Sequence, residues 1–124
     1  MKETLEFTAM VSGTESDEYS LTAGVLQPET GEYVSFQRCV TDGKDDEGVY
    51  FEFNDQSNGW YNEITSCRVF RNSLTVALNE SAAKESGVCL VHVELKISDV
   101  QHVEFVSMLK NIFRNTGSTF RVEL

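Results

Sequence analysis

An acidic run is the first feature of this sequence whose residue types suggest chemistry. Residues 42–48 read Asp-Gly-Lys-Asp-Asp-Glu-Gly, and clustered carboxylates are the ligands that a hard cation such as Ca²⁺ prefers. The spacing does not match an EF-hand loop, because Lys44 occupies the third position and Phe53 stands where the bidentate glutamate belongs. We therefore interpret the run as a solvated loop and predict no metal and no cofactor.

The histidines and cysteines offer little for catalysis. His92 is out of phase with the apolar positions of its predicted strand, and His102 precedes the helical position Val103, so both are interpreted as surface histidines. A Cys-His pairing stays open, although Cys89 falls on an apolar strand face, where a thiol is buried and inert. Since no nucleophile, acid–base group and electrophilic group are predicted to converge, we do not expect an enzyme.

Polar side chains on one predicted strand are better suited to binding. Tyr50, Glu52 and Asn54 alternate with apolar residues, so they share one strand face and can be presented to a partner. The simpler interpretation of Glu52 is a cross-strand ion pair with Arg38, which contributes only about 0.2–1 kcal/mol when exposed. The strand registers are not fixed by the sequence, so both interpretations stay open.

Two large aromatic residues follow closely in the chain. Trp60 and Tyr61 come after Asn58-Gly59, and their rings either cap the core from a loop or anchor a partner protein. Together with the strand face and the acidic loop they complete the predicted partner-binding site, which consists of Asp42, Asp45, Asp46, Glu47, Tyr50, Glu52, Asn54, Asp55, Trp60 and Tyr61.

Negative charge is concentrated in the first half of the chain, whose formal net charge overall is −10. Residues 1–63 hold fourteen acids and three bases, whereas residues 64–124 hold six acids and seven bases. A negative potential of this kind repels nucleic-acid phosphates and anionic lipids, and it steers basic proteins into contact. We therefore expect a protein partner, and neither nucleic acid nor a membrane; the composition does not predict the oligomeric state.

Length and composition predict one globular domain. The chain has 124 residues, of which 40% are hydrophobic, which is enough for a core without metal or disulfide support. Three widely spaced cysteines without a Cys-x-x-Cys motif fit neither a disulfide framework nor a zinc cluster. No signal-peptide stretch follows Met1-Lys2, and no run approaches the ~18 apolar residues of a membrane span. We expect a single domain over residues 1–124, located in the cytoplasm.

Apolar residues recur at every second position in many short segments, which is typical of half-buried strands. The pattern predicts strands over residues 4–11, 19–26, 33–40, 49–54, 64–70, 74–78, 88–97 and 119–124. The polar segments 12–18, 27–32 and 55–59 are predicted as turns or loops, and 81–86 as a short helical turn that ends at Gly87.

One longer helix is predicted near the C-terminus. Ser98 and Gln101 have the spacing of a capping box, and Gly117 is the predicted stop. The helix is expected to lay an apolar stripe on the sheet, formed by Val103, Val106, Leu109, Ile112 and Phe113. The predicted fold is therefore α+β, with a mostly antiparallel sheet of about six to eight strands and one amphipathic helix packed on it.

Three short motifs carry a resemblance to a known family. They are Phe36-Gln37-Arg38, the segment 48–56 (Gly-Val-Tyr-Phe-Glu-Phe-Asn-Asp-Gln) and the segment 70–76 (Phe-Arg-Asn-Ser-Leu-Thr-Val). In this order, followed by a strand and a helix that ends in Lys110-Asn111-Ile112-Phe113, they resemble the tenth group of immunity proteins from bacterial polymorphic toxin systems. The resemblance implies a cytosolic antitoxin that binds a cognate toxin domain and blocks it without chemistry. Many such toxins are nucleases, whose basic active sites an acidic surface would occupy in competition with nucleic acid.

Two other functions stay open at this point. A small-ligand module or an enzyme would line a deep pocket with polar residues such as Tyr50, Glu52 and His92. An adaptor subunit of a larger complex would expose an apolar patch rather than an acidic one. A shallow acidic surface would instead favour capture of a protein.

Overall fold

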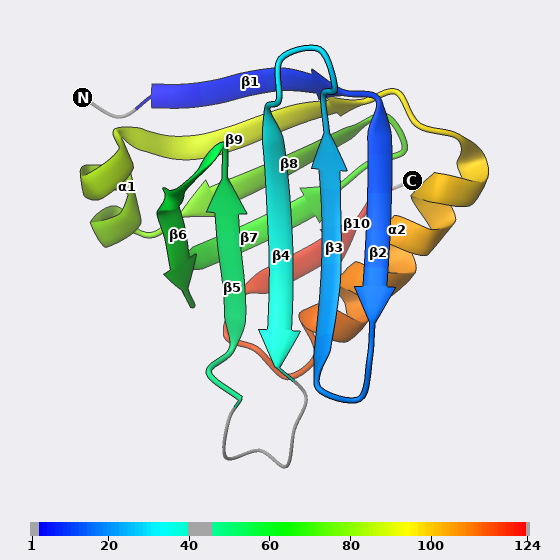
Figure 1. Ribbon diagram of the computed structural model, residues 1–124. Helices are drawn as coiled ribbons and strands as arrows, with labels where there is room; N and C mark the ends of the chain where they lie inside the picture. Colours follow the sequence, from blue (N-terminus) through cyan, green and yellow to red (C-terminus); the bar gives the residue numbers. More distant parts are fainter. Residues whose placement is uncertain (1–2, 40–45, 124) are drawn as a thin grey trace.

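The computed structural model describes residues 3–39 and 46–123, which form ten strands in two five-stranded sheets and two helices (Figure 1). The predicted α+β class and the helix near the C-terminus are confirmed, but the prediction of one sheet with six to eight strands is wrong, since ten strands form two sheets. In chain order the elements are β1 (Glu3–Ala9), β2 (Val11–Ser16), β3 (Ser20–Leu26), β4 (Tyr33–Cys39), β5 (Val49–Phe53), β6 (Asp55–Tyr61), β7 (Ile64–Val69), β8 (Ser73–Leu78), α1 (Glu80–Ser86), β9 (Val88–Leu95), α2 (Asp99–Ile112) and β10 (Thr119–Val122).

The two sheets have different topologies. The first, which we call the meander sheet, pairs β2, β3, β4, β5 and β6 in sequence order, and every pairing is antiparallel. The second, the mixed sheet, has the order β1-β9-β8-β7-β10, with parallel pairing at both edges. The strands of the mixed sheet run behind the meander sheet at a steep angle to it (Figure 1).

Side chains from both sheets and from α2 form the core. Phe36 and Phe51 of the meander sheet are fully buried, as are Leu74 and Val76 of β8 and Val91 and Val93 of β9. Helix α2 packs against β2, β3 and β4, and the rings of Phe105 and Phe113 lie 6.4 and 5.9 Å from that of Phe36. Mixed sheet and helix therefore cover the same, inner face of the meander sheet. No described element covers its outer face.

The predicted strand 4–11 is divided between the two sheets. β1 pairs with β9 in the mixed sheet, and the chain then passes at Met10 into β2, which pairs with β3. Phe7 and Ala9 are buried, whereas Val11 is 41% exposed, so the alternation that suggested one strand ends at Ala9. A strand that changes sheets reverses which of its residues face the core.

Two segments predicted as loops are strands. β2 (Val11–Ser16) occupies most of the predicted turn 12–18, and β6 covers the predicted loop 55–59. They are the two edges of the meander sheet, where each has a neighbour on one side only. Polar edge strands are common because they discourage pairing with other chains. Because the sequences of β2 and β6 are polar, they lack the apolar alternation that predicts a strand.

Several predicted elements are confirmed. β3, β4, β5 and β9 lie where strands were predicted, β7 and β8 form the predicted hairpin, and β10 is an edge strand. The turn 27–32 closes with a 2.8 Å hydrogen bond from the Gln27 amide to the Glu32 carbonyl. α1 ends at Gly87, whose φ of 79° is the left-handed conformation that glycine adopts most readily.

The face of α2 that meets the core differs from the prediction. The capping box of Ser98 and Gln101 is present, but the helix ends at Ile112, before Gly117. His102 is buried, with its Nε2 3.0 Å from the Phe70 carbonyl oxygen, and Val103 is 65% exposed. The predictions of a surface His102 and a buried Val103 are wrong, because Phe105 and His102 begin the buried stripe one position earlier.

The buried cysteine is also not the one predicted. Cys67 is fully buried, and burial raises the pKa of its thiol far above the ordinary value. Cys89 is only half-buried, because it lies at an irregularity where Glu3 pairs with Val88 and Thr4 with Leu90. The unreactive core thiol is therefore Cys67.

The capping box gives a first prediction. Replacing Ser98 by alanine removes the acceptor for the Gln101 amide, so the variant should lose about 1 kcal/mol of the free energy of unfolding. Urea denaturation measures this loss. Ser107→Ala, at an exposed position of the same helix, is the matched control and should be neutral or slightly stabilising. Equal effects of the two substitutions would contradict the role of the cap.

Candidate functional site: the outer face of the meander sheet

The outer face of the meander sheet has a central row of mostly small residues. Register places one outward-facing residue of each strand opposite the next, so that the row crosses all five strands: Gly13, Gly24, Ser35, Glu52 and Gly59. Only Glu52 has a long side chain. A row without large side chains leaves a depression across the sheet.

Larger side chains flank this row on both sides. Along one side lie Val11, Leu26 and Tyr33, and along the other Glu15, Thr22, Gln37, Tyr50 and Tyr61. A hollow of about 470 Å³ lies over β2, β3 and β4, and a second of about 660 Å³ lies over β4, β5 and β6. Tyr33 and Ser35 line both hollows, and we call the combined feature the cross-sheet groove.

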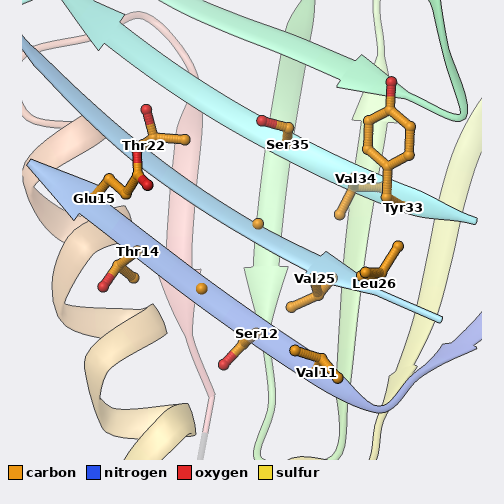
Figure 2. Close-up of a pocket in the computed structure, with 12 residues that line it drawn as sticks. Val11, Ser12, Thr14, Glu15, Thr22, Val25, Leu26, Tyr33, Val34 and Ser35 are labelled. Carbon is orange, nitrogen blue, oxygen red and sulfur yellow. The ribbon is translucent and has the colours of Figure 1, made fainter. Parts of the chain in front are cut away.

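Figure 2 shows the β2–β4 end of the cross-sheet groove. Thr22, Ser35 and Tyr33 rise from one side of the sheet, while Thr14 projects from the other side, towards α2. Val11 and Leu26 are 41% and 38% exposed, so this end of the groove is apolar at its rim. The β5–β6 end is polar, since Gln37, Glu52 and Gln56 line it.

Glu52 is the centre of the polar end. The Tyr50 hydroxyl donates a 2.7 Å hydrogen bond to one carboxylate oxygen, and the Tyr33 hydroxyl donates to the other. The hydrogen bond to Glu52 raises the pKa of Tyr50 to about 12, and burial together with Glu52 raises the pKa of Tyr33. Both hydroxyls therefore stay protonated at neutral pH. None of the ion pairs among the described residues involves Glu52.

Gly59 and Tyr61 of β6 complete this end. A Cβ at position 59 would collide with the Tyr50 hydroxyl, so glycine lets Tyr50 reach Glu52 across the floor. The ring of Tyr61 is 52% exposed and lies 5.1 Å from that of Tyr50. Tyr33 and Ser35 were not predicted as site residues, because their position beside Glu52 depends on the register between β4 and β5.

The predicted ion pair between Arg38 and Glu52 is wrong. Arg38 is paired with Val49 in register, and it lies on the inner face with Phe36, whereas Glu52 lies on the outer face. The Arg38 guanidinium instead binds Asp46 at 2.9 Å and donates to the carbonyls of Ile112, at 2.8 Å, and Arg114. Arg38 therefore ties the segment before β5 to the end of α2.

The predicted acidic residues have different roles in the structure. Asp42 and Asp45 lie outside the described residues, and the Asp46 charge is matched by Arg38. Glu47 is exposed, and Asp55 is exposed at the start of β6, where it accepts a 2.9 Å hydrogen bond from the Ser57 amide.

Asn54 and Trp60 serve the fold. Asn54 turns the chain between β5 and β6 with a φ of 60°, and its side chain accepts a hydrogen bond from the Tyr33 amide at 2.9 Å. Trp60 lies on the face opposite Tyr61, packs against Phe53 at 6.0 Å and donates to Glu85 of α1 at 2.6 Å. Of the predicted site, the structure therefore gathers Tyr50, Glu52 and Tyr61 in one place.

Most of the acidic first half of the sequence forms the meander sheet, so negative charge is concentrated in one layer of the molecule. Residues 11–39 and 46–61, which contain the described part of the meander sheet, hold nine acids and one base, Arg38. Among these acids, only Asp46 forms an ion pair within the described residues. The side of the molecule built by the meander sheet is therefore strongly negative.

Tyr50, Glu52 and His92, the residues that an enzyme pocket would bring together, do not lie in one place. His92 contacts Thr75 and Glu94 on the outer face of the mixed sheet, at 3.0 Å each, so a different layer separates it from Tyr50 and Glu52. Within the described residues, no three His, Cys, Asp or Glu side chains are grouped to hold a metal ion. Neither described helix has the length and apolarity needed to cross a membrane.

The fold and this face define the class: a two-sheet α+β domain whose meander sheet has an outer face that no described element covers and lies in the acidic part of the sequence. The family model described as Immunity protein 10 matches residues 7–103, which is most of the chain and includes every strand of the meander sheet. The chain belongs to this immunity protein family, as the sequence motifs predicted. No curated protein matched the chain in a sequence search.

The Arg38–Asp46 contact predicts a pH-dependent contribution to stability. Arg38, and then the Gly48 amide, hold the pKa of Asp46 below its ordinary value. Because the folded-state pKa lies below that of the unfolded chain, the stabilisation is present at neutral pH and is lost as the pH falls through the folded-state pKa. Asp46→Asn should therefore lower the free energy of unfolding by up to about 1 kcal/mol at neutral pH, allowing for solvent screening.

Urea denaturation of this variant and the wild type from neutral pH towards pH 3 tests the sign. The difference between them should shrink as the pH falls. Glu47→Gln is the matched control, since it removes the same charge from the neighbouring exposed side chain. A loss that is the same at every pH would assign the effect to packing rather than to the ion pair.

Proposed function

We propose that this protein is an antitoxin that binds a cognate toxin domain and neutralises it without catalysis. The observation that carries the proposal is the outer face of the meander sheet, which no described element covers and which lies in the acidic part of a member of an immunity protein family. The face offers an apolar rim at one end and polar, aromatic residues at the other. Protein interfaces combine such features, with aromatic anchors contributing much of the binding energy.

The negative charge of the meander-sheet side supports a toxin whose binding surface is positively charged. Carboxylates without internal ion pairs raise the negative potential around the meander sheet, and this potential accelerates encounter with a positively charged partner. A nuclease is the toxin class that fits best, because its active site must attract phosphates. We propose that the antitoxin acts in the cytoplasm, where such a toxin would reach nucleic acid.

The proposed contact residues are those on or beside this face. Tyr50, Glu52 and Tyr61 form the centre. Glu47 and Asp55 are exposed before β5 and at the start of β6, and we propose that they add negative charge around the contact. Asp42 and Asp45 remain proposals from the sequence alone. Because Asp46, Asn54 and Trp60 have structural partners, we assign them to the support of the site.

Co-expression tests the function directly. The toxin domain encoded beside this gene should arrest growth when expressed alone, and growth should recover when this protein is present. The two purified chains should also form a stable complex on size-exclusion chromatography. Growth arrest that persists in the presence of correctly folded antitoxin would contradict the proposal.

The electrostatic part gives a separate prediction. The triple variant Glu15→Gln, Glu18→Gln, Glu29→Gln removes three exposed charges from the meander-sheet side, and none of these carboxylates forms an ion pair with another described residue. Its association rate constant with the toxin domain should fall about tenfold at low salt, and less as salt is added.

Stopped-flow or surface-based kinetics over a salt series measures this rate. The matched control removes three exposed charges from the mixed sheet, at Glu3, Glu6 and Glu94, and should have a smaller effect. An association rate that does not respond to salt, or equal effects of both triples, would remove electrostatic steering from the mechanism.

A further inference from the structure

We propose, on the basis of the function above, that the cross-sheet groove receives an extended segment of the toxin and that Glu52 binds an arginine side chain of that segment. The groove belongs to the outer face of the meander sheet, and its charged end is formed by Glu52 with Tyr33, Tyr50 and Tyr61. The proposal names the occupant of the groove and the residue that selects it.

Glu52 is prepared for a cation from outside the chain. Its carboxylate is half-buried and is held by two neutral hydroxyl donors, yet no cation of the described residues pairs with it. A carboxylate has about four acceptor positions, so two remain after the tyrosines have donated. Aligned carboxylate oxygens with open positions suit the forked N–H groups of a guanidinium.

The aromatic surroundings favour arginine over lysine. The rings of Tyr50 and Tyr61 lie 5.1 Å apart beside the carboxylate, and the Tyr61 ring is about half exposed. A planar guanidinium stacks on such rings while it pairs with a carboxylate, whereas a strongly hydrated ammonium group gains less. Ser35, Gln37 and Gln56 line the same hollow and add polar partners around the bound group.

The shape of the groove favours an extended chain. The row from Gly13 to Glu52 crosses four strands and spans about 14 Å at about 4.8 Å per strand spacing, whereas Tyr50 covers Gly59 on the fifth strand. An extended segment rises about 3.3 Å per residue, so about four residues fit over this row. The apolar rim at Val11 and Leu26 lies two to three strands from Glu52, so we expect an apolar toxin side chain three or four residues from the arginine.

The charged end can be tested without the toxin. In ¹⁵N-resolved NMR spectra, Nα-acetyl-arginine amide should shift the backbone amides of Ser35, Glu52 and Gly59 in a saturable, millimolar titration. The citrulline analogue has nearly the same shape but no charge, and it should cause shifts at least fivefold smaller. Glu52→Gln should abolish the response to arginine. Equal responses to both compounds, or shifts centred elsewhere, would overturn the proposal.

Two substitutions test the groove against the toxin domain. Glu52→Gln removes the charge but keeps an oxygen for the tyrosines, and Gly13→Val places a side chain where a Cβ meets no atom within 4 Å. Each should weaken binding by tenfold or more in calorimetry. Unchanged thermal unfolding would show that both variants fold, and valine in an extended strand should not reduce stability.

Matched controls separate a specific site from a general effect. Glu6→Gln removes one exposed charge from the mixed sheet, and Ser66→Val adds a valine side chain there, so neither should change toxin affinity more than twofold. If the wild type binds the toxin but Glu52→Gln and Gly13→Val bind equally well, the groove proposal fails and the antitoxin function stands. If the wild type does not bind the toxin at all, the antitoxin function fails, while the arginine titration still decides whether Glu52 is a guanidinium site.

Discussion

The packing of Phe36 decides which face of the meander sheet is available. Its ring is fully buried and contacts Phe51 in the same sheet and Phe105 and Phe113 from α2 and its C-terminal end. These contacts hold the helix and the mixed sheet on one side of the meander sheet, so every residue of opposite parity faces outward. Ser35, Gln37 and Glu52 are presented to solvent for this reason, and the polar tyrosine cluster depends on a core that contains none of its members.

Much of the fold follows from local pattern, but the site does not. Strands β3, β4 and β9, the β7–β8 hairpin and the cap at Ser98 could all be predicted, because each is recorded in alternation or spacing within a few residues. The edge strands β2 and β6 were missed because their polar sequences resemble loops. The groove needs the register of four strand pairings at once, and a shift of one residue would send Glu52 to the core.

The distribution of charge along the sequence matches the division of the structure into two sheets. The acidic first half of the sequence coincides with the meander sheet, and its single described base, Arg38, is engaged by Asp46 and by backbone carbonyls at the end of α2. Among the described acids of residues 11–61, Asp46 is the one with an ion pair. Glu52 is distinct because two tyrosine hydroxyls hold its carboxylate on the sheet face, whereas Asp17 and Asp55 accept hydrogen bonds from backbone amides close to them in sequence.

The parallel pairs at the two edges of the mixed sheet have a consequence for biosynthesis. The meander sheet comes from one contiguous segment, residues 11–61, whereas β1 must wait for β9 and β10 must return to β7. Contacts between distant parts of a chain form slowly and late, and domains acquire their rigidity during synthesis only as those contacts close. The ribosome therefore delivers the complete meander sheet before most of the mixed sheet and α2, so a nascent chain can display the groove before the elements behind it hold its shape.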